Sequence, residues 1–296
     1  MQLSPLRELS GEFPESCEEL YTSRLPSGQL WNRCFRGPRG HFWIEFVGLA
    51  LFSVSKDGLK IAGRALGTTS GHTLEHLHLN QVVPLAASLQ SRIIFHGGAV
   101  EIDGAAVAFV GRSGLGKSTL TASFAKSGFN FLTDDTLELE RRSSVYFVRA
   151  GHPSIRLWAD STLELIQDSG SRWPDIDYSD KGRFVSNAQL PHSNRVAPLT
   201  AIYLLALAVG SEIEIAPSPP SQAAVELIAQ SFLLDIHSPT TLEKHLDYVS
   251  DLIRRKLVFV LSYPRSFARL EEVRAIVVSH STQLMRISRR SVVAPE

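Results

Sequence analysis

Short apolar runs separated by turn-forming residues make up the first 90 residues of the chain. The runs 42–47 and 51–54 have the length and the aromatic or β-branched content of strands. The pair Asp57-Gly58 that follows them is a strong hairpin signal, and the apolar segment 82–89 predicts a short helix. These patterns predict a small β-rich domain over residues 1–90.

Strand-like runs alternate with longer helical segments from residue 91 onward, which predicts an α/β domain over residues 91–296. The polar segment 169–193 is rich in turn formers, so we expect a mobile loop or lid, or disorder. Gly128 stands where the first helix needs a left-handed cap. Strands are expected at 99–102, 106–110, 129–133, 136–140, 145–148, 201–209 and 257–261, with a short apolar segment at 155–158. Helices are expected at 119–126, 161–167, 223–232, 242–256 and 270–284.

The composition is that of a globular protein, with 44% hydrophobic and 20% charged residues among 296. The formal net charge is +0, so we expect no nucleic-acid partner, which would require a basic stripe. The longest apolar stretch, 201–209, is much shorter than the roughly 20 residues that span a bilayer. The first residues also lack the apolar core of a secretory signal. We therefore expect a cytoplasmic protein with no membrane partner, and we expect Cys17 and Cys34 to be free thiols.

A complete match to the motif G-x-x-x-x-G-K-[ST] lies between the predicted strand 106–110 and the predicted helix 119–126. Its glycines let the backbone bend so that successive N–H groups converge on phosphate oxygens, and the following helix start adds its own N–H groups. Lys117 can follow the terminal phosphates, and the Ser118 hydroxyl is placed to ligate Mg²⁺. The motif therefore predicts that the chain binds ATP and Mg²⁺. The expected nucleotide-binding residues are Gly111, Arg112, Ser113, Gly114, Leu115, Gly116, Lys117, Ser118 and Thr119.

An acidic pair, Asp134-Asp135, follows the predicted strand 129–133. Ligands of open α/β sheets gather at the carboxyl ends of strands, so we expect the pair to face the phosphate loop. One carboxylate can hold Mg²⁺ and the other can accept a hydroxyl proton. Adjacent strand residues point to opposite sides, so both face one site only if the strand has ended. We take Asp134 as the base and Asp135 as the metal ligand, with their order left open; a turn or helix-cap pair is the alternative.

Four more side chains are candidates for the same site. His96 precedes a Gly-Gly step and could orient a carboxylate, or it is a buried histidine with its hydrogen bonds satisfied. Arg156 lies among apolar residues and needs a partner, either a phosphate or an internal carboxylate. Lys181 and Arg183 lie in the polar segment; they either close over a transferring phosphoryl group or are solvated loop charges.

Two weaker patterns point elsewhere. His72-Thr73-Leu74-Glu75-His76 fits the H-x-x-E-H pattern of some zinc peptidases, and a helix would place both histidines on one face. A third ligand is not evident, and Gly71 favours a helix start, so we expect a chance histidine cluster on a partly exposed helix. The basic runs 254–256 and 289–290 are expected to be solvated, with a weak grip on an acidic peptide as the alternative.

The phosphate loop and its surroundings resemble a known family. His96-Gly97-Gly98-Ala99-Val100, Asp103-Gly104, the loop 111–119 and Thr133-Asp134-Asp135 are similar to the C-terminal catalytic domain of HPr kinase/phosphorylase, which is related to phosphoenolpyruvate carboxykinases. The whole chain looks even more like the HPr-kinase-like proteins found with ribosomally made peptides, including lasso-peptide clusters. The resemblance implies a P-loop kinase core with a mixed central sheet. It also implies that His96 lies beside the acidic pair, with Lys117 and Asp134 as further catalytic residues.

These observations together favour a kinase that transfers the γ-phosphoryl group of ATP to a serine hydroxyl of a peptide or protein, such as a ribosomal precursor peptide. A small-molecule kinase is one alternative, and a nucleotide-dependent switch or ATPase without a phosphoryl acceptor is another. The paired carboxylates favour an acceptor base and so disfavour the switch. The residues leave the choice between ATP and GTP open, and a homo-oligomer is compatible with the resemblance.

Overall fold

The computed structural model describes residues 6–10, 13–25, 27–166, 172–208 and 210–293. The chain divides into two compact units. Unit 1 comprises residues 1–93, 174–180 and 232–246, and unit 2 comprises residues 94–173, 181–231 and 247–296. Two segments of unit 1 therefore come from the part of the sequence that we assigned to the second domain.

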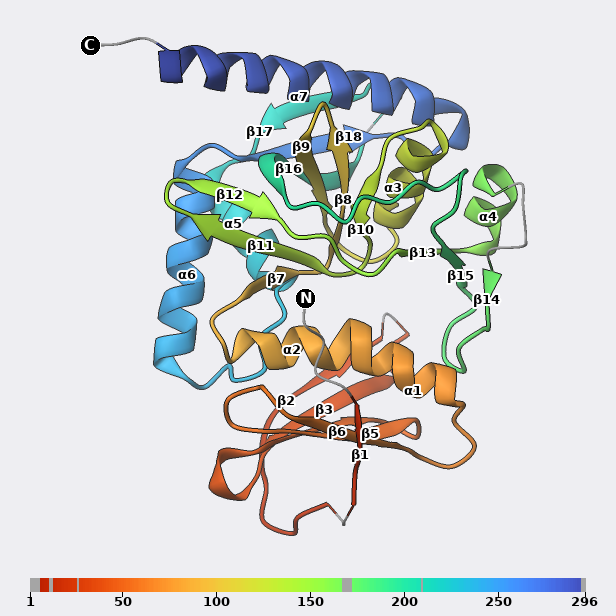
Figure 1. Ribbon diagram of the computed structural model, residues 1–296, viewed down its shortest axis with the longest axis vertical. Coiled ribbons are helices and arrows are strands. Elements are labelled where there is room, and N and C mark those ends of the chain that lie inside the picture. The colour runs from red at the N-terminus through yellow and green to blue at the C-terminus, as the bar shows by residue number, and fades with distance from the viewer. Residues whose placement is uncertain (1–5, 11–12, 26, 167–171, 209, 294–296) are drawn as a thin grey trace. The chain divides into compact units, whose positions relative to one another are not determined.

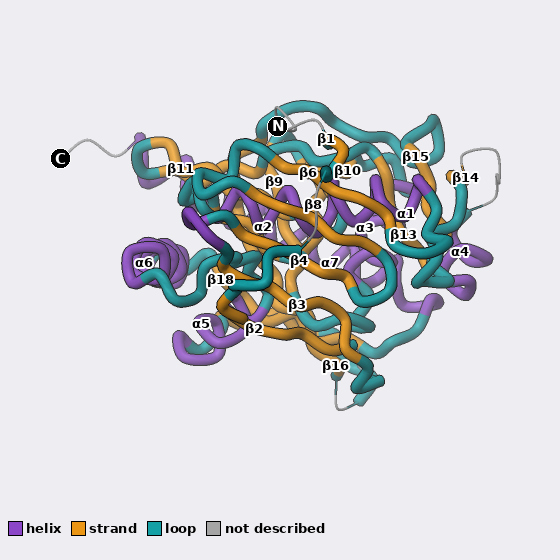
Figure 2. The backbone as a smooth tube through the Cα atoms, turned by 90° about the horizontal axis from the view of Figure 1, so that it is seen from below, coloured by secondary structure: helices purple, strands orange, loops and turns teal. Residues whose placement is uncertain are grey.

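Unit 1 is a six-stranded sheet with a layer of helix (Figure 1). The strand order is β1-β6-β5-β4-β3-β2, with β1 parallel to β6 and every other pair antiparallel. Figure 2 shows β2, β3 and β4 side by side. The strands are β1 (Arg7–Glu8), β2 (Glu18–Arg24), β3 (Leu30–Arg36), β4 (Phe42–Phe46), β5 (Ala50–Val54) and β6 (Ile61–Ala65), with a 3₁₀ turn at Pro38–Gly40. The helical layer is α1 (Gly71–Leu77), a π-helical turn (His78–Val82) and α2 (Val83–Ser88).

The core of unit 1 follows from the alternation of side chains along its strands. In β4, Phe42, Ile44 and Phe46 are buried and the residues between them are partly exposed. These side chains pack in one cluster with Leu77 and Val82 of the helical layer. Full burial of a large apolar side chain stabilises a fold by about 2 kcal/mol, so this alternation fixes the face that β4 turns to the helices.

Unit 2 is built on a mixed nine-stranded sheet. Its order is β10-β8-β9-β16-β12-β11-β7, and β18 pairs with both β16 and β17. The central strand β16 is parallel to β9 and β18, whereas β8 is antiparallel to β9 and β10. The strands are β7 (Ile93–Phe95), β8 (Gly97–Ile102), β9 (Ala105–Val110), β10 (Phe131–Thr133), β11 (Leu137–Arg142), β12 (Val145–Val148), β16 (Ala197–Leu207), β17 (Glu214–Pro217) and β18 (Val258–Tyr263).

Helices and a small second sheet complete unit 2. Helix α3 (Lys117–Lys126) and helix α7 (Leu270–Val293) share one core cluster, which includes Phe124 of α3 and Val277 of α7. All six residues of β9 are buried, so the strand that leads into the motif lies inside this core. The three-stranded sheet has the order β13-β15-β14, from β13 (Ser154–Leu157), β14 (Arg172–Trp173) and β15 (Gly182–Val185). The other helices are α4 (Ala159–Leu165), α5 (Pro220–Ala229) and α6 (Pro239–Arg254), with a 3₁₀ turn at Phe267–Arg269.

Most of the predicted elements are confirmed as an α/β fold with a mixed sheet, and Gly128 has the expected positive φ of +91°. The prediction of a loop, lid or disorder over 169–193 is wrong for β14 and β15, because their backbones pair with each other and with β13. Helix α7 also continues past the predicted end at residue 284. Parts of the predictions for 161–167, 169–193 and 201–209 lie outside the described residues, namely 167, 169–171 and 209.

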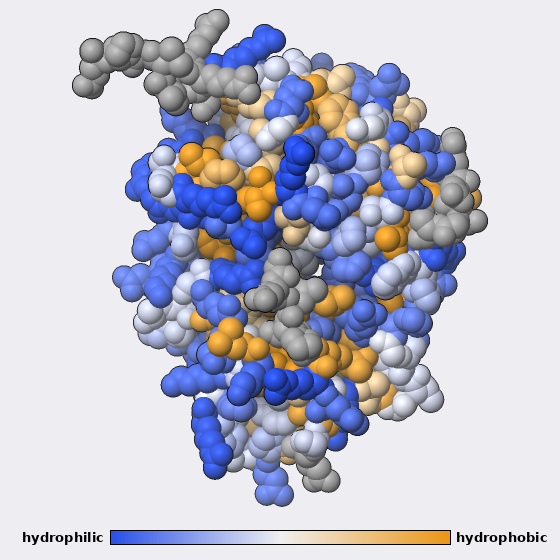
Figure 3. Space-filling view, viewed as in Figure 1, coloured by the Kyte–Doolittle hydropathy of each residue, from blue (hydrophilic) through white to orange (hydrophobic). Residues whose placement is uncertain are grey.

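The surface mixes polar and apolar residues on the face that Figure 3 shows. Exposed large apolar side chains include Trp158, Leu163, Leu207 and Val225. Among the helices of the described ranges, none is both long enough and apolar enough to cross a membrane.

Candidate functional site

The glycine-rich loop connects the buried strand β9 to the first turn of α3. Gly116 has φ +92° just before the helix begins, a conformation that strains other residues. A Cβ atom at this position would also lie 2.8 Å from the Tyr263 hydroxyl. That hydroxyl donates a 2.9 Å hydrogen bond to the Leu115 carbonyl, so β18 holds the loop from one side. The helix start directs its free N–H groups and positive dipole end into the loop.

Lys117 is the first residue of α3, and its side chain turns back onto the loop. The ammonium group donates hydrogen bonds to the carbonyl of Gly111 at 2.6 Å and to that of Arg112 at 3.2 Å. Burial lowers the pKa of Lys117 to about 8, although the charges of Asp135 and Asp134 act to raise it. A positive charge is therefore held at the centre of the loop.

The acidic pair stands where β10 has ended, as the sequence argument required for both carboxylates to serve one site. Asp135 has a φ of +66°, which marks a sharp turn of the chain directly after the strand. Asp134 is 7% exposed, and its Oδ2 accepts a 3.0 Å hydrogen bond from the Arg156 backbone N–H. The Ser118 hydroxyl donates to the same carboxylate. Burial raises the pKa of Asp134, and the charge of Asp135 raises it further.

The Oδ1 atom of Asp134 is buried and, within the described part of the chain, has no hydrogen-bond partner. A buried carboxylate oxygen without a partner is costly, and a cation or an ordered water satisfies it. The strand β8 approaches closely here, because a Cβ atom at Gly98 would lie 2.4 Å from Thr121 Oγ1 and 3.5 Å from Asp134 Oδ1. The Gly-Gly step after His96 thus leaves room for the carboxylate against α3.

His96 and Arg156 both contact Asp135. The Asp135 backbone carbonyl lies 3.0 Å from His96 Nδ1; a carbonyl can only accept, so Nδ1 carries the proton. Burial lowers the pKa of His96 to about 4, and the charge of Lys117 also lowers it, so the ring is neutral at physiological pH. The Arg156 guanidinium forms an ion pair with Asp135, with 3.8 Å between Nη1 and Oδ2. His96 therefore orients the backbone at Asp135. From the sequence we had expected it to orient a carboxylate.

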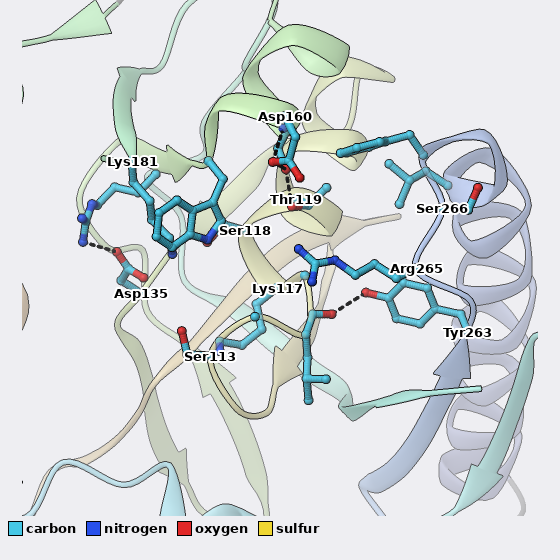
Figure 4. A pocket seen from close by; sticks show the side chains of 18 of the residues that line it. Ser113, Lys117, Ser118, Thr119, Asp135, Asp160, Lys181, Tyr263, Arg265 and Ser266 are labelled. Atoms are coloured by element: carbon cyan, nitrogen blue, oxygen red, sulfur yellow. Dashed lines mark hydrogen bonds and ion pairs between the residues drawn. The ribbon is translucent and has the colours of Figure 1, made fainter. Parts of the chain in front are cut away.

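Several of these groups, though not Asp134, line one cavity of about 220 Å³ (Figure 4). The cavity is bounded by the loop and by residues from three other parts of unit 2. Its lining includes His96, residues 113–119, Asp135, Arg156 and Lys181. It also includes Trp158, Asp160, Ser161, Tyr263, Arg265, Ser266, Phe267 and Leu270, which the sequence did not single out. These residues come from distant segments and belong to no motif, so only the fold reveals their place.

Ser161 and Asp160, two lining residues that the sequence did not single out, connect to the motif by hydrogen bonds. The Thr119 and Ser161 hydroxyls lie 2.9 Å apart, and the Asp160 carboxylate accepts a 2.6 Å hydrogen bond from the Ser161 backbone N–H. The chain that starts at Thr119 therefore ends at a carboxylate beside the cavity. Two other lining residues of the cavity contact each other: the Lys181 ammonium lies over the Trp158 ring, 5.3 Å from its centroid.

Arg183 differs from Lys181 in its surroundings. It is 5% exposed, and its Nε donates a 3.2 Å hydrogen bond to Ser154 Oγ. Its guanidinium carbon lies 4.3 Å from the centre of the Trp173 ring, and its Nη2 lies 3.2 Å from His152 Nδ1. Burial lowers the pKa of His152 to about 4, and the charge of Arg183 lowers it as well. Arg183 thus packs within the three-stranded sheet, whereas Lys181 faces the cavity.

The histidines of the H-x-x-E-H pattern lie on α1, in unit 1. His72 is exposed, whereas His76 is fully buried and lies 2.9 Å from the Asn80 amide through its Nδ1. In the described part of the chain, no three His, Cys, Asp or Glu side chains form a group that could hold a metal ion. The side chains of the run 289–290 lie outside the described residues.

No family model matches the chain, and no curated protein matches it. Among solved structures, it is similar to the Hpr(Ser) kinase/phosphatase from Coxiella burnetii, with 10% sequence identity and a TM-score of 0.35. The similarity covers 65% of this chain and 98% of that one.

Proposed function

We propose that this chain is an ATP-dependent kinase that transfers the γ-phosphoryl group to a serine hydroxyl of a peptide or protein. The observation that carries the proposal is that one cavity is lined by a glycine-rich loop with its lysine, and by a carboxylate that pairs with an arginine and whose backbone contacts a histidine. The loop suits phosphate binding, and the carboxylate suits activation of a hydroxyl. Phosphoryl transfer requires both functions side by side.

The loop supplies the charge and the donors that a triphosphate needs. Backbone N–H groups of residues 113–118 and the start of α3 suit the phosphate oxygens, and the Lys117 ammonium suits their negative charge. The Lys117 ammonium donates to the backbone carbonyls of Gly111 and Arg112, which are neutral acceptors. Moving its charge to a phosphate therefore breaks no salt bridge at these two positions.

The residues beside Lys117 also fit Mg²⁺. Ser118 donates to Asp134, and Asp134 Oδ1 is a buried oxygen with no partner among the described residues. Hydroxyl and carboxylate oxygens are the ligands that Mg²⁺ prefers, and the ion usually keeps several waters. Ser118 and Asp134 would hold the ion, directly or through water, and it would neutralise phosphate charge there.

Asp135 is the residue that we assign to the acceptor. It lines the cavity, whereas Asp134 is occupied by Ser118 and by the Arg156 backbone, so the geometry favours the reverse of the order taken from the sequence. In the transfer, a bond forms between the serine oxygen and the γ-phosphorus, and the bond from that phosphorus to the β–γ bridging oxygen breaks. The serine proton passes to Asp135, and ADP leaves. Arg156 pairs with the Asp135 carboxylate, and His96 holds the backbone of the same residue.

We assign the nucleoside to the end of the cavity that lies opposite Asp135. In the view of Figure 4, Asp135 and Arg265 lie on opposite sides of Lys117. The lining of the cavity also includes the aromatic ring of Phe267 and the apolar side chain of Leu270, which suit a base, and the Arg265 guanidinium, which suits phosphate. The acceptor then enters from the side of Trp158 and Lys181.

The test is direct transfer. The protein is incubated with γ-labelled ATP, Mg²⁺ and serine-containing peptides, beginning with those encoded beside its gene. We expect Lys117→Ala to weaken ATP binding about 100-fold, and Asp135→Asn to lower the rate of transfer by about 10² to 10⁴ while ATP still binds. Asp103→Asn, in the exposed turn between β8 and β9, is the matched control and should leave both unchanged.

The alternatives predict different products. Labelled small molecules in place of peptides would identify a small-molecule kinase. Release of phosphate without label on any acceptor, unaffected by Asp135→Asn, would identify an ATPase or switch. The resemblance of the loop and its surroundings to HPr kinase/phosphorylase, and of the chain to proteins found with ribosomal peptides, makes a precursor peptide the first acceptor to try.

A further inference from the structure

The hairpin formed by β11 and β12 lies against the C-terminal end of α6, within unit 2 (Figure 1). The Arg255 guanidinium, one residue past α6, donates a 2.9 Å hydrogen bond to the carbonyl of Ser144 in the hairpin turn, 111 residues earlier in the chain. The Tyr146 hydroxyl of β12 donates a 3.0 Å hydrogen bond to the Asp251 carboxylate of α6. The structure therefore joins the basic run 254–256 to a distant segment of the sequence.

Asp251 gathers three guanidinium groups at this place. Its carboxylate is 4% exposed, and Oδ2 accepts a 2.7 Å hydrogen bond from Arg255 Nε and lies 3.7 Å from Arg141 Nη1. Its Oδ1 pairs with Arg254 Nη2, and the exposed Lys256 follows in the sequence. We call Arg141, Arg254, Arg255 and Lys256 the basic patch. The patch has four positive charges and contacts one carboxylate, so together with Asp251 it has a net charge of +3.

The basic patch keeps hydrogen-bond donors for a ligand. The side chain of Arg254 is 75% exposed and that of Arg141 is 40% exposed, so both face solvent. Each guanidinium has five N–H donors, and three guanidinium groups share one carboxylate, so donors remain. Arg142, the next residue of β11, points to the opposite face, where Glu140 accepts a 2.8 Å hydrogen bond from its Nε. The excess of positive charge therefore lies on the α6 side of the hairpin.

The basic patch lies within reach of the cavity that Asp135 lines. Strand β11 begins two residues after Asp135, and Arg141 is its fifth residue. Six residues of fully extended chain span about 22 Å, which is therefore the greatest distance between the backbones of Asp135 and Arg141. A peptide in an extended conformation needs about six residues to cover that distance. A substrate held at Asp135 can thus reach the patch with a short segment.

We propose that the basic patch binds an acidic stretch of the peptide or protein acceptor, placed about six residues from the serine that is phosphorylated. The inference rests on the proposed function, in which Asp135 accepts the serine proton. Guanidinium groups suit carboxylates, because two parallel N–H groups can donate to the two oxygens. The formal net charge of the chain is +0, so it lacks the long-range attraction on which binding of nucleic acid depends. The patch adds affinity for the acceptor and leaves the transfer step unchanged.

The first test measures binding of a peptide to the full chain without ATP. The probe is a fluorescein-labelled peptide with one serine and, about six residues away, a block of four aspartates, placed before the serine in one version and after it in the other. A matched peptide has alanines in place of the aspartates. By fluorescence anisotropy, one version of the aspartate peptide should bind about 10-fold more tightly than the alanine peptide, and this difference should shrink as the salt concentration rises.

The variant that tests the patch combines Arg141→Gln with Arg254→Gln. It removes two exposed charges and should weaken binding of the aspartate peptide about 10-fold, with no effect on the alanine peptide. Asp251 keeps its hydrogen bonds from Arg255 and Tyr146 in this variant, so the fold should be retained, which thermal unfolding checks.

Arg142→Gln is the matched control. Arg142 is adjacent to Arg141 and its side chain is 50% exposed, but its charge is balanced by Glu140. Its replacement should leave binding of both peptides unchanged. Lys256→Gln changes an exposed member of the patch and should weaken binding of the aspartate peptide about 3-fold; it replaces the double variant if that variant does not fold.

The second test measures transfer to the same peptides. In the double variant, KM for the aspartate peptide should rise about 10-fold while its kcat stays the same, and both constants for the alanine peptide should stay the same. An aspartate block placed directly beside the serine should give no advantage, because it cannot reach the patch. Equal KM values for the aspartate and alanine peptides, or equal losses from Arg142→Gln and the double variant, would overturn the proposal.

The two tests also separate this proposal from the kinase assignment. Transfer to both peptides with no preference for aspartate refutes the docking role and leaves the kinase standing. Binding of the aspartate peptide through the patch, in a protein that transfers no phosphoryl group to any acceptor, refutes the kinase assignment and leaves a surface for acidic peptides. A single-stranded DNA that binds more tightly than the aspartate peptide, and loses affinity in the double variant, would overturn the assignment of the patch to a peptide.

Discussion

The contact between Gly116 and Tyr263 allows a quantitative test of the loop. Gly116→Ala introduces two costs. A residue with a Cβ at φ +92° costs about 1 to 2 kcal/mol relative to glycine. The new Cβ would also lie 2.8 Å from the Tyr263 hydroxyl, so the hydroxyl must move and its hydrogen bond to the Leu115 carbonyl is lost, at about 1 kcal/mol.

Gly116→Ala therefore destabilises the present conformation of the loop by about 2 to 3 kcal/mol in total. If this conformation binds ATP, the affinity falls by roughly 30- to 150-fold, since about 1.4 kcal/mol is tenfold. The assay is titration of ATP by calorimetry, with thermal unfolding as a check on the fold.

The structure also predicts a rescue. The next nearest atom to the added Cβ is the Tyr263 ring carbon Cζ at 4.0 Å, so removal of the hydroxyl removes the close contact. In a Tyr263→Phe background, Gly116→Ala should therefore cost only the backbone strain, roughly 5- to 30-fold in affinity. Gly114→Ala is the matched control, because Gly114 has φ +88° and no atom within 4 Å of an added Cβ. Equal losses from Gly116→Ala in both backgrounds would refute the steric reasoning.

Three further predictions concern stability and the site. Burial lowers the pKa of His96 from about 6.5 to about 4, so as the pH falls the unfolded chain binds a proton at this residue before the folded chain does. The contribution of neutral His96 to the free energy of unfolding is therefore complete above pH 6.5 and is lost as the pH falls towards 4. Between pH 7 and pH 4 this loss amounts to about 3 kcal/mol. In His96→Gln, the free energy of unfolding measured with denaturant should therefore change less between these two pH values. Asp251→Asn should destabilise the fold by about 2 kcal/mol, because the carboxylate is 4% exposed and accepts from Arg255 and Tyr146, whereas Asp247→Asn on the exposed face of α6 should change it little. The Asp251 contribution is complete above pH 4 and is lost towards pH 2, since its folded pKa is about 2; equal midpoints for the two α6 variants in urea would contradict it. Gly98→Ala should destabilise the fold by at least 1 kcal/mol through its 2.4 Å approach to Thr121 Oγ1, and Thr121→Ser should leave this cost in place because it keeps the hydroxyl.

Local patterns predicted the elements whose own residues determine them. Strand β4 was predicted from the length and the aromatic and β-branched content of the run 42–47, and the loop from the fixed spacing of its motif. Strand β2 was missed because its sequence, EELYTSR, is largely polar; it lies at the edge of its sheet, where burial is slight. Strands β14 and β15 were missed because they are defined by pairing with each other and with β13, which short sequence windows do not contain.

The site shows the same division. The loop and the acidic pair follow from motif and position, but the order of the two carboxylates depends on the turn at Asp135, whose φ of +66° the sequence did not predict. Tyr263 lies 148 residues from Leu115, which accepts its hydrogen bond, and Asp160 lies on a helix with no motif of its own. Such residues reach the cavity because the order of the strands in the sheet brings distant segments together. A single sequence contains no local signal for that order.

The way the chain passes between the units has a consequence for how the protein can be divided. It crosses five times, after residues 93, 173, 180, 231 and 246. A fragment that begins at residue 94 would carry two orphaned pieces of the first core, including Leu234, which is fully buried there, and Tyr178. The remaining fragment would lack the same side chains. The two units are thus interleaved parts and not modules that a single cut could separate, so neither could have been gained or exchanged by simple end-to-end fusion.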